Sequence, residues 1–166
     1  MNLLFLGNAI SMIGCLIMVL IGFLKKKNQI LIAQCVQCLF MGVGNLVLGG
    51  VSGFICNIVT IIRNLVFVRF QNTTFLKVFF ILLQFVLSIG TLSAGWISWL
   101  PILAAALFTW CMDTKSAARL KLCILCTQVM WLIYDLYYRN YVASAFDVMT
   151  MVSNLIGLYM VCRKKA

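Results

Sequence analysis

Apolar stretches follow one another along this 166-residue chain with almost no polar sequence between them. Hydrophobic residues make up 64% of the chain and charged residues 10%, whereas a soluble domain has about 45–50% apolar and about 25% charged residues. A soluble fold of this size has no interior large enough for so much apolar surface. The composition excludes a water-soluble domain, a disordered segment, a coiled coil and a nucleic-acid-binding arm, and predicts a polytopic membrane protein.

The stretches have the length of transmembrane helices. A helix needs about 20 residues to cross a bilayer, so the chain has room for about seven spans and for no soluble domain. A single proline and long aliphatic runs favour helices over a membrane barrel. No Lys or Arg precedes the first stretch, so we expect a span there and not a secretory signal. We predict an all-α protein with spans at about 3–24, 29–48, 51–69, 75–92, 97–112, 117–138 and 141–162.

Basic residues collect at one set of helix ends. Of the 13 Lys and Arg, Arg139 alone lies at the opposite ends and Arg63 lies inside a span. Because Lys and Arg are retained in the cytoplasm, we expect the N-terminus outside and the C-terminus inside. The net charge of +10 then reflects topology and attraction to anionic headgroups, and we expect no nucleic acid as a partner. The remaining basic residues are Lys25, Lys26, Lys27, Arg69, Lys77, Lys115, Arg119, Lys121, Arg163, Lys164 and Lys165.

The chain aligns with itself at an offset of 90 residues. The matches pair Asn45 with Asp135, Asn57 with Asp147, Thr60 with Thr150, Asn64 with Asn154, Leu65 with Leu155 and Lys25 with Lys115. Most are polar residues inside apolar helices, where chance matches are rarer than among Leu and Val. We predict a 3+1+3 parallel repeat: three-helix units at 1–70 and 96–166, joined by a linker transmembrane helix in 71–95.

Four stretches resemble a known family. The strings GFLKKKNQ, LVLGGVSGFICNIVTIIRNLVFVRF, WLPILAAALFTW and FDVMTMVSNLIGLY are similar to the YgjV-type bacterial inner membrane proteins, over nearly the whole chain. The resemblance implies the bacterial inner (plasma) membrane and supplies no biochemical function. By its 3+1+3 plan the family is distantly similar to SWEET sugar facilitators, PQ-loop transporters and PnuC-type vitamin transporters, which implies transport. A PQ dipeptide is missing, and Pro101 is the one proline, whereas SWEET proteins carry several on their moving helices.

Polar side chains inside the spans mark the predicted substrate-binding site. Two sets at the spacing i, i+3, i+7 each share one helix face: Asn57, Thr60 and Asn64 in the third span, and Asp147, Thr150 and Asn154 in the last. A carboxylate near the bilayer centre costs about 2.5–3.5 kcal/mol on insertion scales, so Asp147 needs a partner or a water-filled cavity. Asp147 either binds a solute or carries a proton, or it joins helices by hydrogen bonds; the asparagines have the same alternatives.

Arg63 and Trp131 complete the predicted site. Arg63 either balances Asp147, holds an anionic group of the solute, or extends its side chain to the cytoplasmic headgroups. Trp131 lies with Gln128 and Asp135 on adjoining turns, so it either stacks on a ring of the solute or packs against lipid and neighbouring helices.

The outer end of the sixth span has an interfacial pattern. Asp135 and Arg139 stand at i and i+4, which predicts a pair at the solvated helix end. Tyr134, Tyr137 and Tyr138 lie around the same end, where aromatic residues form a belt at the water interface. We therefore expect these residues at the membrane surface and outside the solute site.

The eight cysteines do not indicate a metal or a disulfide. Cys35 and Cys38, and Cys123 and Cys126, have the spacing CxxC in the middle of apolar helices, and the chain has no histidine. Zinc sites usually present this spacing on turns, whereas a thiol buried in a helix behaves as a small apolar group. We expect no metal, no cofactor and, without a recognisable base or phosphate loop, no enzymatic activity.

These observations favour a membrane transporter or facilitator of a small polar solute, such as a sugar, nucleoside or vitamin-like compound. It would work by alternating access between the two three-helix units, as a monomer or as a homo-oligomer. The alternative is a non-transporting membrane receptor or scaffold that binds a lipid or a partner protein. The identity of the solute and the choice between proton coupling and passive facilitation stay open.

Overall fold

The computed structural model describes residues 2–21, 27–70, 73–112, 114 and 117–163. These residues form seven α-helices, with two short 3₁₀ helices at Ile89–Ala94 and Trp96–Ser98. The α-helices are α1 (Leu3–Ile21), α2 (Lys27–Val47), α3 (Val51–Arg69), α4 (Thr74–Ser88), α5 (Trp99–Cys111), α6 (Ala117–Tyr137) and α7 (Tyr141–Arg163).

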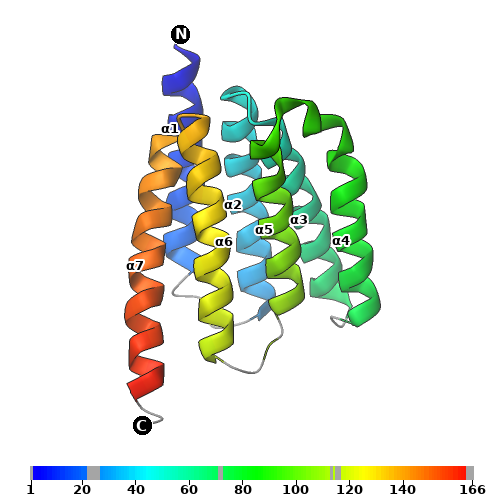
Figure 1. The fold of residues 1–166 in the computed structure, drawn as a ribbon, viewed down its shortest axis with the longest axis vertical. Helices are drawn as coiled ribbons and strands as arrows, with labels where there is room; N and C mark the ends of the chain where they lie inside the picture. The colour runs from blue at the N-terminus through cyan, green and yellow to red at the C-terminus, as the bar shows by residue number, and fades with distance from the viewer. Residues whose placement is uncertain (1, 22–26, 71–72, 113, 115–116, 164–166) are drawn as a thin grey trace.

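The helices stand side by side and alternate in direction (Figure 1). One end of the bundle carries the start of α1 and the tight α2–α3 and α6–α7 connections; we call it the turn end. The opposite end carries Arg69, Arg119 and Arg163, and we call it the basic end. The charge distribution predicts that the turn end faces outside.

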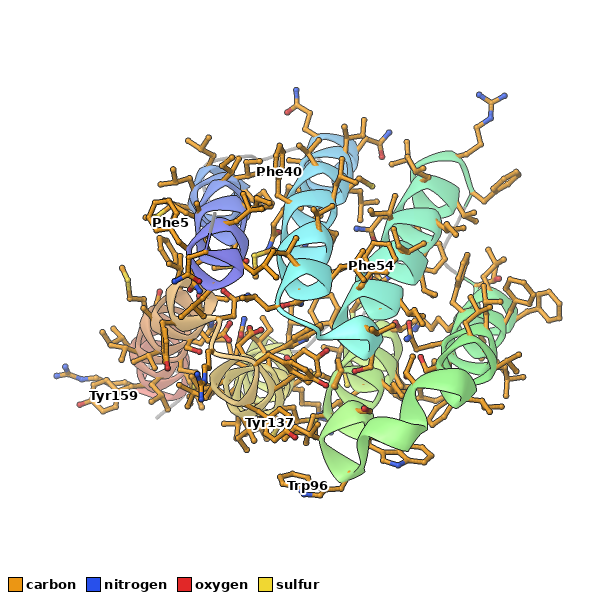
Figure 2. All side chains as sticks on the ribbon, turned by 90° about the horizontal axis from the view of Figure 1, so that it is seen from above. Phe5, Phe40, Phe54, Trp96, Tyr137 and Tyr159 are labelled. Carbon is orange, nitrogen blue, oxygen red and sulfur yellow. The ribbon has the colours of Figure 1, made fainter. Side chains whose placement is uncertain are left out.

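Seen along the helices, the chain forms two rows (Figure 2). The helices α1, α2 and α3 make one row, and α7, α6 and α5 make the facing row. The rows meet where α1 packs on α7 and where α3 packs on α5. The remaining helix, α4, lies at one end of the rows and contacts α3 and α5.

The turns at the turn end are closed by matching backbone hydrogen bonds. After α2, the Gly50 N–H donates to the Asn45 carbonyl at 2.7 Å, and Gly49 has a φ of 87°. After α6, the Asn140 N–H donates to the Asp135 carbonyl at 2.8 Å, and Arg139 has a φ of 58°. Both are helix C-caps with a left-handed residue, a conformation that favours glycine.

The surface is apolar and much of the interior is polar. Phe5, Phe75 and Trp96 are each more than two-thirds exposed. Side chains buried inside include Ser11, Asn45, Ser52, Asn64, Gln84, Asp135 and Asn140. Among the described residues, five helices are long and apolar enough to cross a membrane, and the segments Trp96–Cys111 and Tyr141–Ile156 are shorter apolar helices. This distribution is consistent with a polytopic membrane protein.

The helices agree closely with the predicted spans except in the middle of the chain. The fourth span was predicted over 75–92, but α4 ends at Ser88 and continues as 3₁₀ turns as far as Ser98. Gly95 has a φ of 87°, which an α-helix does not accommodate. The predicted span was too long because the sequence stays apolar beyond Ser88, where the α-helix ends.

Candidate solute-binding cavity

A cavity of about 200 Å³ lies between the two rows. All the described α-helices except α4 contribute to its wall, mostly with residues from their middle turns. Its lining residues are Cys15, Met18, Gln34, Gln37, Cys38, Met41, Asn57, Thr60, Arg63, Ala104, Ala105, Phe108, Ile124, Thr127, Gln128, Trp131, Asp135, Ala143, Phe146 and Asp147. The wall thus combines amide, hydroxyl, carboxyl and guanidinium groups with aromatic rings, which suits a small polar solute.

Two carboxyl groups from different helices meet in this wall. Asp135 on α6 is 1% exposed and Asp147 on α7 is 7% exposed. Their side chains lie close to each other. Two ionised carboxylates this close would repel each other, so a shared proton or another cation would stabilise the pair. Within the described structure, Asp135 Oδ1 and Asp147 Oδ2 have no hydrogen-bond partner. We call Asp135 and Asp147 the acid pair.

The acid pair corrects the prediction that Asp135 forms a surface pair with Arg139. The side chain of Asp135 points into the bundle, whereas Arg139 is exposed in the α6–α7 turn. The turn returns the chain directly into α7, which brings Asp147 to Asp135. The sequence did contain a signal that Asp135 is buried. The offset of 90 residues matches it with Asn45, which is also fully buried.

Tyr134 is likewise in the interior, and its predicted place in the interfacial belt is wrong. Its hydroxyl oxygen accepts hydrogen bonds from the Gly53 N–H at 2.8 Å and from Ser52 Oγ at 3.1 Å. A Cβ on Gly50 or Gly53 would lie 2.6–2.7 Å from Tyr134. Glycine at these two positions is therefore what lets the ring approach the first turn of α3.

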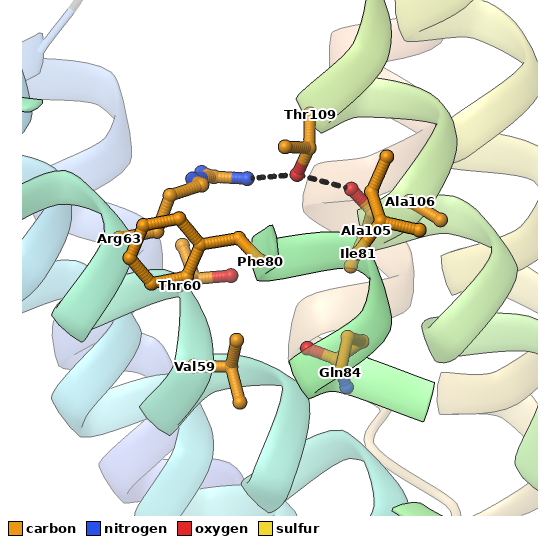
Figure 3. Close-up of a pocket in the computed structure, with 9 residues that line it drawn as sticks. All are labelled: Val59, Thr60, Arg63, Phe80, Ile81, Gln84, Ala105, Ala106 and Thr109. Atoms are coloured by element: carbon orange, nitrogen blue, oxygen red, sulfur yellow. Dashed lines mark hydrogen bonds between the residues drawn. The ribbon is translucent and has the colours of Figure 1, made fainter. Parts of the chain in front are cut away.

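Arg63 is buried, 3% exposed, and bonds across the rows (Figure 3). Its Nη1 donates to Thr109 Oγ1 on α5 at 2.6 Å, and Thr109 donates onward to the Ala105 carbonyl at 2.7 Å. Its Nε and Nη2 donate to Asn64 Oδ1, and the guanidinium lies 5.8 Å from the centre of the Phe108 ring. The predicted alternative of extension to the headgroups does not occur, since these bonds hold the side chain inside.

The structure brings together five of the eight predicted site residues. Asn57, Thr60, Arg63, Trp131 and Asp147 line the cavity, and Asn57 also donates to the Gly53 carbonyl at 2.8 Å.

The other three predicted residues lie outside the cavity wall. Asn64 is fully buried beside Arg63 and donates to Gln34 Oε1 at 3.2 Å. Asn154 donates to the carbonyl of Thr150 at 2.9 Å, within its own helix. Only the first two turns of α7 reach the cavity, so a shared helix face does not place Thr150 and Asn154 there. Sequence analysis had also passed over Gln34, Gln37, Thr127 and Phe146, which carry no motif.

Hydrogen bonds at the turn end join the two rows. Asn140 Nδ2 donates to Ser11 Oγ at 3.0 Å and to Asn45 Oδ1 at 3.1 Å. Asn8 donates to the Arg139 carbonyl and accepts from the Val142 N–H, each at 3.0 Å. Together with the Tyr134 bonds, these contacts form what we call the turn-end network. The cavity lies on the basic-end side of it.

The cysteines described by the structure are all free thiols. Cys15 and Cys38 contribute to the cavity wall. Within the described part of the chain, no group of three or more metal-ligating side chains comes together.

Comparison with known proteins gives one match. No curated protein and no solved structure matches the chain. A family model described as a bacterial inner membrane protein matches residues 5–165, which confirms the resemblance to YgjV-type proteins and places the protein in the bacterial inner membrane. The more distant similarity to SWEET, PQ-loop and PnuC-type transporters stays a prediction. The chain belongs to the Imp-YgjV family of bacterial inner membrane proteins.

Proposed function

We propose that this protein moves a small polar solute across the inner membrane by alternating access between the α1–α3 and α5–α7 rows. The observation that carries the proposal is the polar cavity between the rows, about 200 Å³ in volume and lined by residues of six helices. Buried polar groups in a membrane protein are costly unless they bind one another or a ligand. The two unpartnered carboxyl oxygens favour a ligand.

The arrangement of the helices supports the predicted repeat. At the 90-residue offset, α1 corresponds to α5, α2 to α6 and α3 to α7. A two-fold axis parallel to the helices, between α2 and α6, would exchange the two rows in this way (Figure 2). The matching caps at Gly49 and Arg139 follow the same offset. Transporters built from such repeats bind their solutes at the repeat interface.

The turn-end network supplies a closed end for the cavity in this proposal. Its bonds from Asn140 and Tyr134 connect α1, α2 and α3 with the opposite row. Opening toward the turn end would separate these pairs, and the glycines beneath Tyr134 would let the surfaces slide. A two-state mechanism of this kind needs contacts that form in one state and break in the other.

The predicted site residues take distinct roles. Asp147, Asn57 and Thr60 bind the solute and Trp131 packs against it, while Arg63 joins α3 to α5 at the cavity wall through its bond to Thr109. We propose that Asn64 acts through Arg63, which it holds by hydrogen bonds. Thr150 and Asn154 stay candidates for contacts made when the rows separate.

Flux measurements with the purified protein test the proposal. Wild-type protein in lipid vesicles is presented with pools of sugars, nucleosides, vitamins, amino acids and amines, and mass spectrometry identifies the solutes that enter. We expect uptake of one chemical class, lost in Asp147→Asn and retained in Asp113→Asn, which makes the same change of net charge outside the described residues. Stabilisation by lipids alone, with no uptake and no effect of Asp147→Asn, would overturn transport in favour of a receptor or scaffold.

A further inference from the structure

We propose that the transported solute is a cation, and that the acid pair binds its protonated amine in exchange for a proton. This inference rests on the proposed transport function and names the chemical class of its substrate. It assigns to Asp135 and Asp147 a binding role that neither the repeat nor the family supplies.

The unmet hydrogen-bonding capacity of the acid pair is entirely that of acceptors. Asp135 Oδ1 and Asp147 Oδ2 are buried and unpartnered, and both residues belong to the cavity wall. A ligand that completes both oxygens must donate a hydrogen bond to each of them. An ammonium group has three N–H donors and a positive charge, and charge-assisted bonds of this kind are the strong ones.

The protein itself provides no cation at this place. Of the described residues in the cavity wall, Arg63 is the basic one, and it bonds to Thr109 and Asn64. The titratable neighbours of the acid pair are the Cys15 thiol on α1 and the Tyr134 phenol on α6. Asn140 also approaches Asp135, and α5 presents no titratable group to the cavity. Each of these neighbours is uncharged in its ordinary form.

Aromatic rings surround the same part of the cavity. Trp131 precedes Asp135 by one helical turn and so shares its face of α6, and Phe146 directly precedes Asp147 on α7. Both rings belong to the cavity wall. Faces of Trp and Phe attract ammonium groups, so the carboxyl groups and the rings favour the same ligand charge. A neutral donor forms weaker hydrogen bonds with these carboxyl groups than an ammonium group does, and an anionic solute is repelled by them.

The contact between the two carboxyl groups makes the binding an exchange. In the proposed exchange the solute-free pair holds one proton, because two ionised carboxylates this close would repel each other. When an ammonium group enters, its N–H donors occupy the carboxylate oxygens, and the shared proton leaves to solvent. The charge brought by the solute thereby replaces the charge of the proton.

Matched amine and alcohol probes test the charge of the solute. Detergent-purified protein is titrated calorimetrically with butane-1,4-diamine and butane-1,4-diol, and with phenethylamine and 2-phenylethanol. We expect the amines to bind at least about tenfold more tightly than the alcohols, since a hydrogen bond to a charged group exceeds a neutral one by about a factor of two in energy. Asp135→Asn and Asp147→Asn should each lose at least about tenfold in amine affinity, and Asp113→Asn should retain it.

Proton release is measured on the wild type alone, so it does not depend on how the variants fold. Amine titrations in two buffers of different ionisation enthalpy should differ by the heat of about one proton released per amine bound. Equal heats in both buffers would overturn the exchange. Thermal melts of the ligand-free variants show whether each is folded before its affinity is compared.

The outcomes separate this inference from the transport function. Three results would overturn the amine site. They are no binding of the amines, alcohols that bind as tightly as the amines, and a rise in melting temperature with NaCl as large as the rise with the amines. If a neutral solute then crosses the vesicle membrane, the transport function stands without it. Amine binding that is lost in the Asn variants, with no amine uptake into vesicles, would instead support the site and overturn transport.

Discussion

Replacing Tyr134 with phenylalanine removes one oxygen atom from the turn-end network. In the wild type that oxygen accepts from the Gly53 N–H and from Ser52 Oγ. Gly53 lies in the first turn of α3, where backbone N–H groups have no partner within the helix. Tyr134→Phe therefore leaves a buried N–H and a buried hydroxyl without this acceptor, while the ring keeps its volume.

The magnitude follows from these two groups. Leaving a buried donor unsatisfied costs about 1–3 kcal/mol. The Ser52 hydroxyl is free to rotate, whereas the Gly53 N–H is fixed by the backbone, so we assign the main cost to Gly53. We expect a destabilisation of about 1–3 kcal/mol in total. For a chain of this size about 1 kcal/mol corresponds to about 2–4 °C in melting temperature, so Tyr134→Phe should melt roughly 2–12 °C below the wild type.

The assay is thermal unfolding of the detergent-purified protein, with Tyr137→Phe as the control. Tyr137 lies on the same helix and is 61% exposed. Its substitution by phenylalanine removes the same hydroxyl group. The control should melt with the wild type. If Tyr134→Phe melts within about 1 °C of Tyr137→Phe, the Tyr134 hydroxyl has no buried partners. The reasoning that removed Tyr134 from the interfacial belt would then be refuted.

Three further substitutions probe other parts of the fold by the same melting assay. Gly53→Ala should destabilise by about 1–3 kcal/mol because its Cβ would overlap the Tyr134 ring, whereas Gly90→Ala, with nothing within 4 Å, should melt with the wild type. Arg139→Gly should raise the melting temperature, since a non-glycine residue at a φ of 58° carries about 1 kcal/mol of strain; a lower melting temperature would contradict this. Thr109→Val should destabilise by about 1.5–3 kcal/mol, because buried Arg63 loses its 2.6 Å bond, and an unchanged melting temperature would argue against that bond.

The helices could be predicted from sequence because a bilayer permits few alternatives. An apolar stretch of span length must satisfy its backbone groups internally, so it forms a helix. This argument depends on composition, and it fails where composition and backbone diverge. The stretch after Ser88 is still apolar, yet it forms 3₁₀ turns that lead to Gly95, whose φ is 87°.

The cavity could be predicted only in part. Periodicity shows which residues share a helix face, but it does not show how far along the helix that face lines a cavity. On α3 the face of Asn57, Thr60 and Arg63 follows the cavity wall. On α7 the corresponding face leaves the cavity after Asp147, and Asn154 turns to its own backbone. How far a cavity extends along a helix depends on how its neighbours tilt, which no spacing within one helix encodes.

Asp135 shows why a position near a helix end misleads. It stands two residues before the end of α6, and an exposed Arg139 follows at i+4, so a solvated pair is the simplest prediction. The α6–α7 turn instead lies beneath α1, where Asn8 and Ser11 bond to it. The deciding contacts come from a helix more than a hundred residues earlier in the chain, and a local pattern does not contain them.

The 90-residue offset also gives the acid pair a counterpart in the first half of the chain. It places Asn45 opposite Asp135 and Asn57 opposite Asp147, so both amides of the first half correspond to carboxyl groups in the second. An amide is neutral whatever its partners, whereas two neighbouring carboxyl groups require a proton or another cation to avoid repulsion. If the halves derive from one ancestral unit, the two carboxyl groups distinguish the second half from the first. The carboxyl part of the site would then come from α6 and α7, and the α1–α3 row would contribute amide and hydroxyl groups such as Asn57 and Thr60.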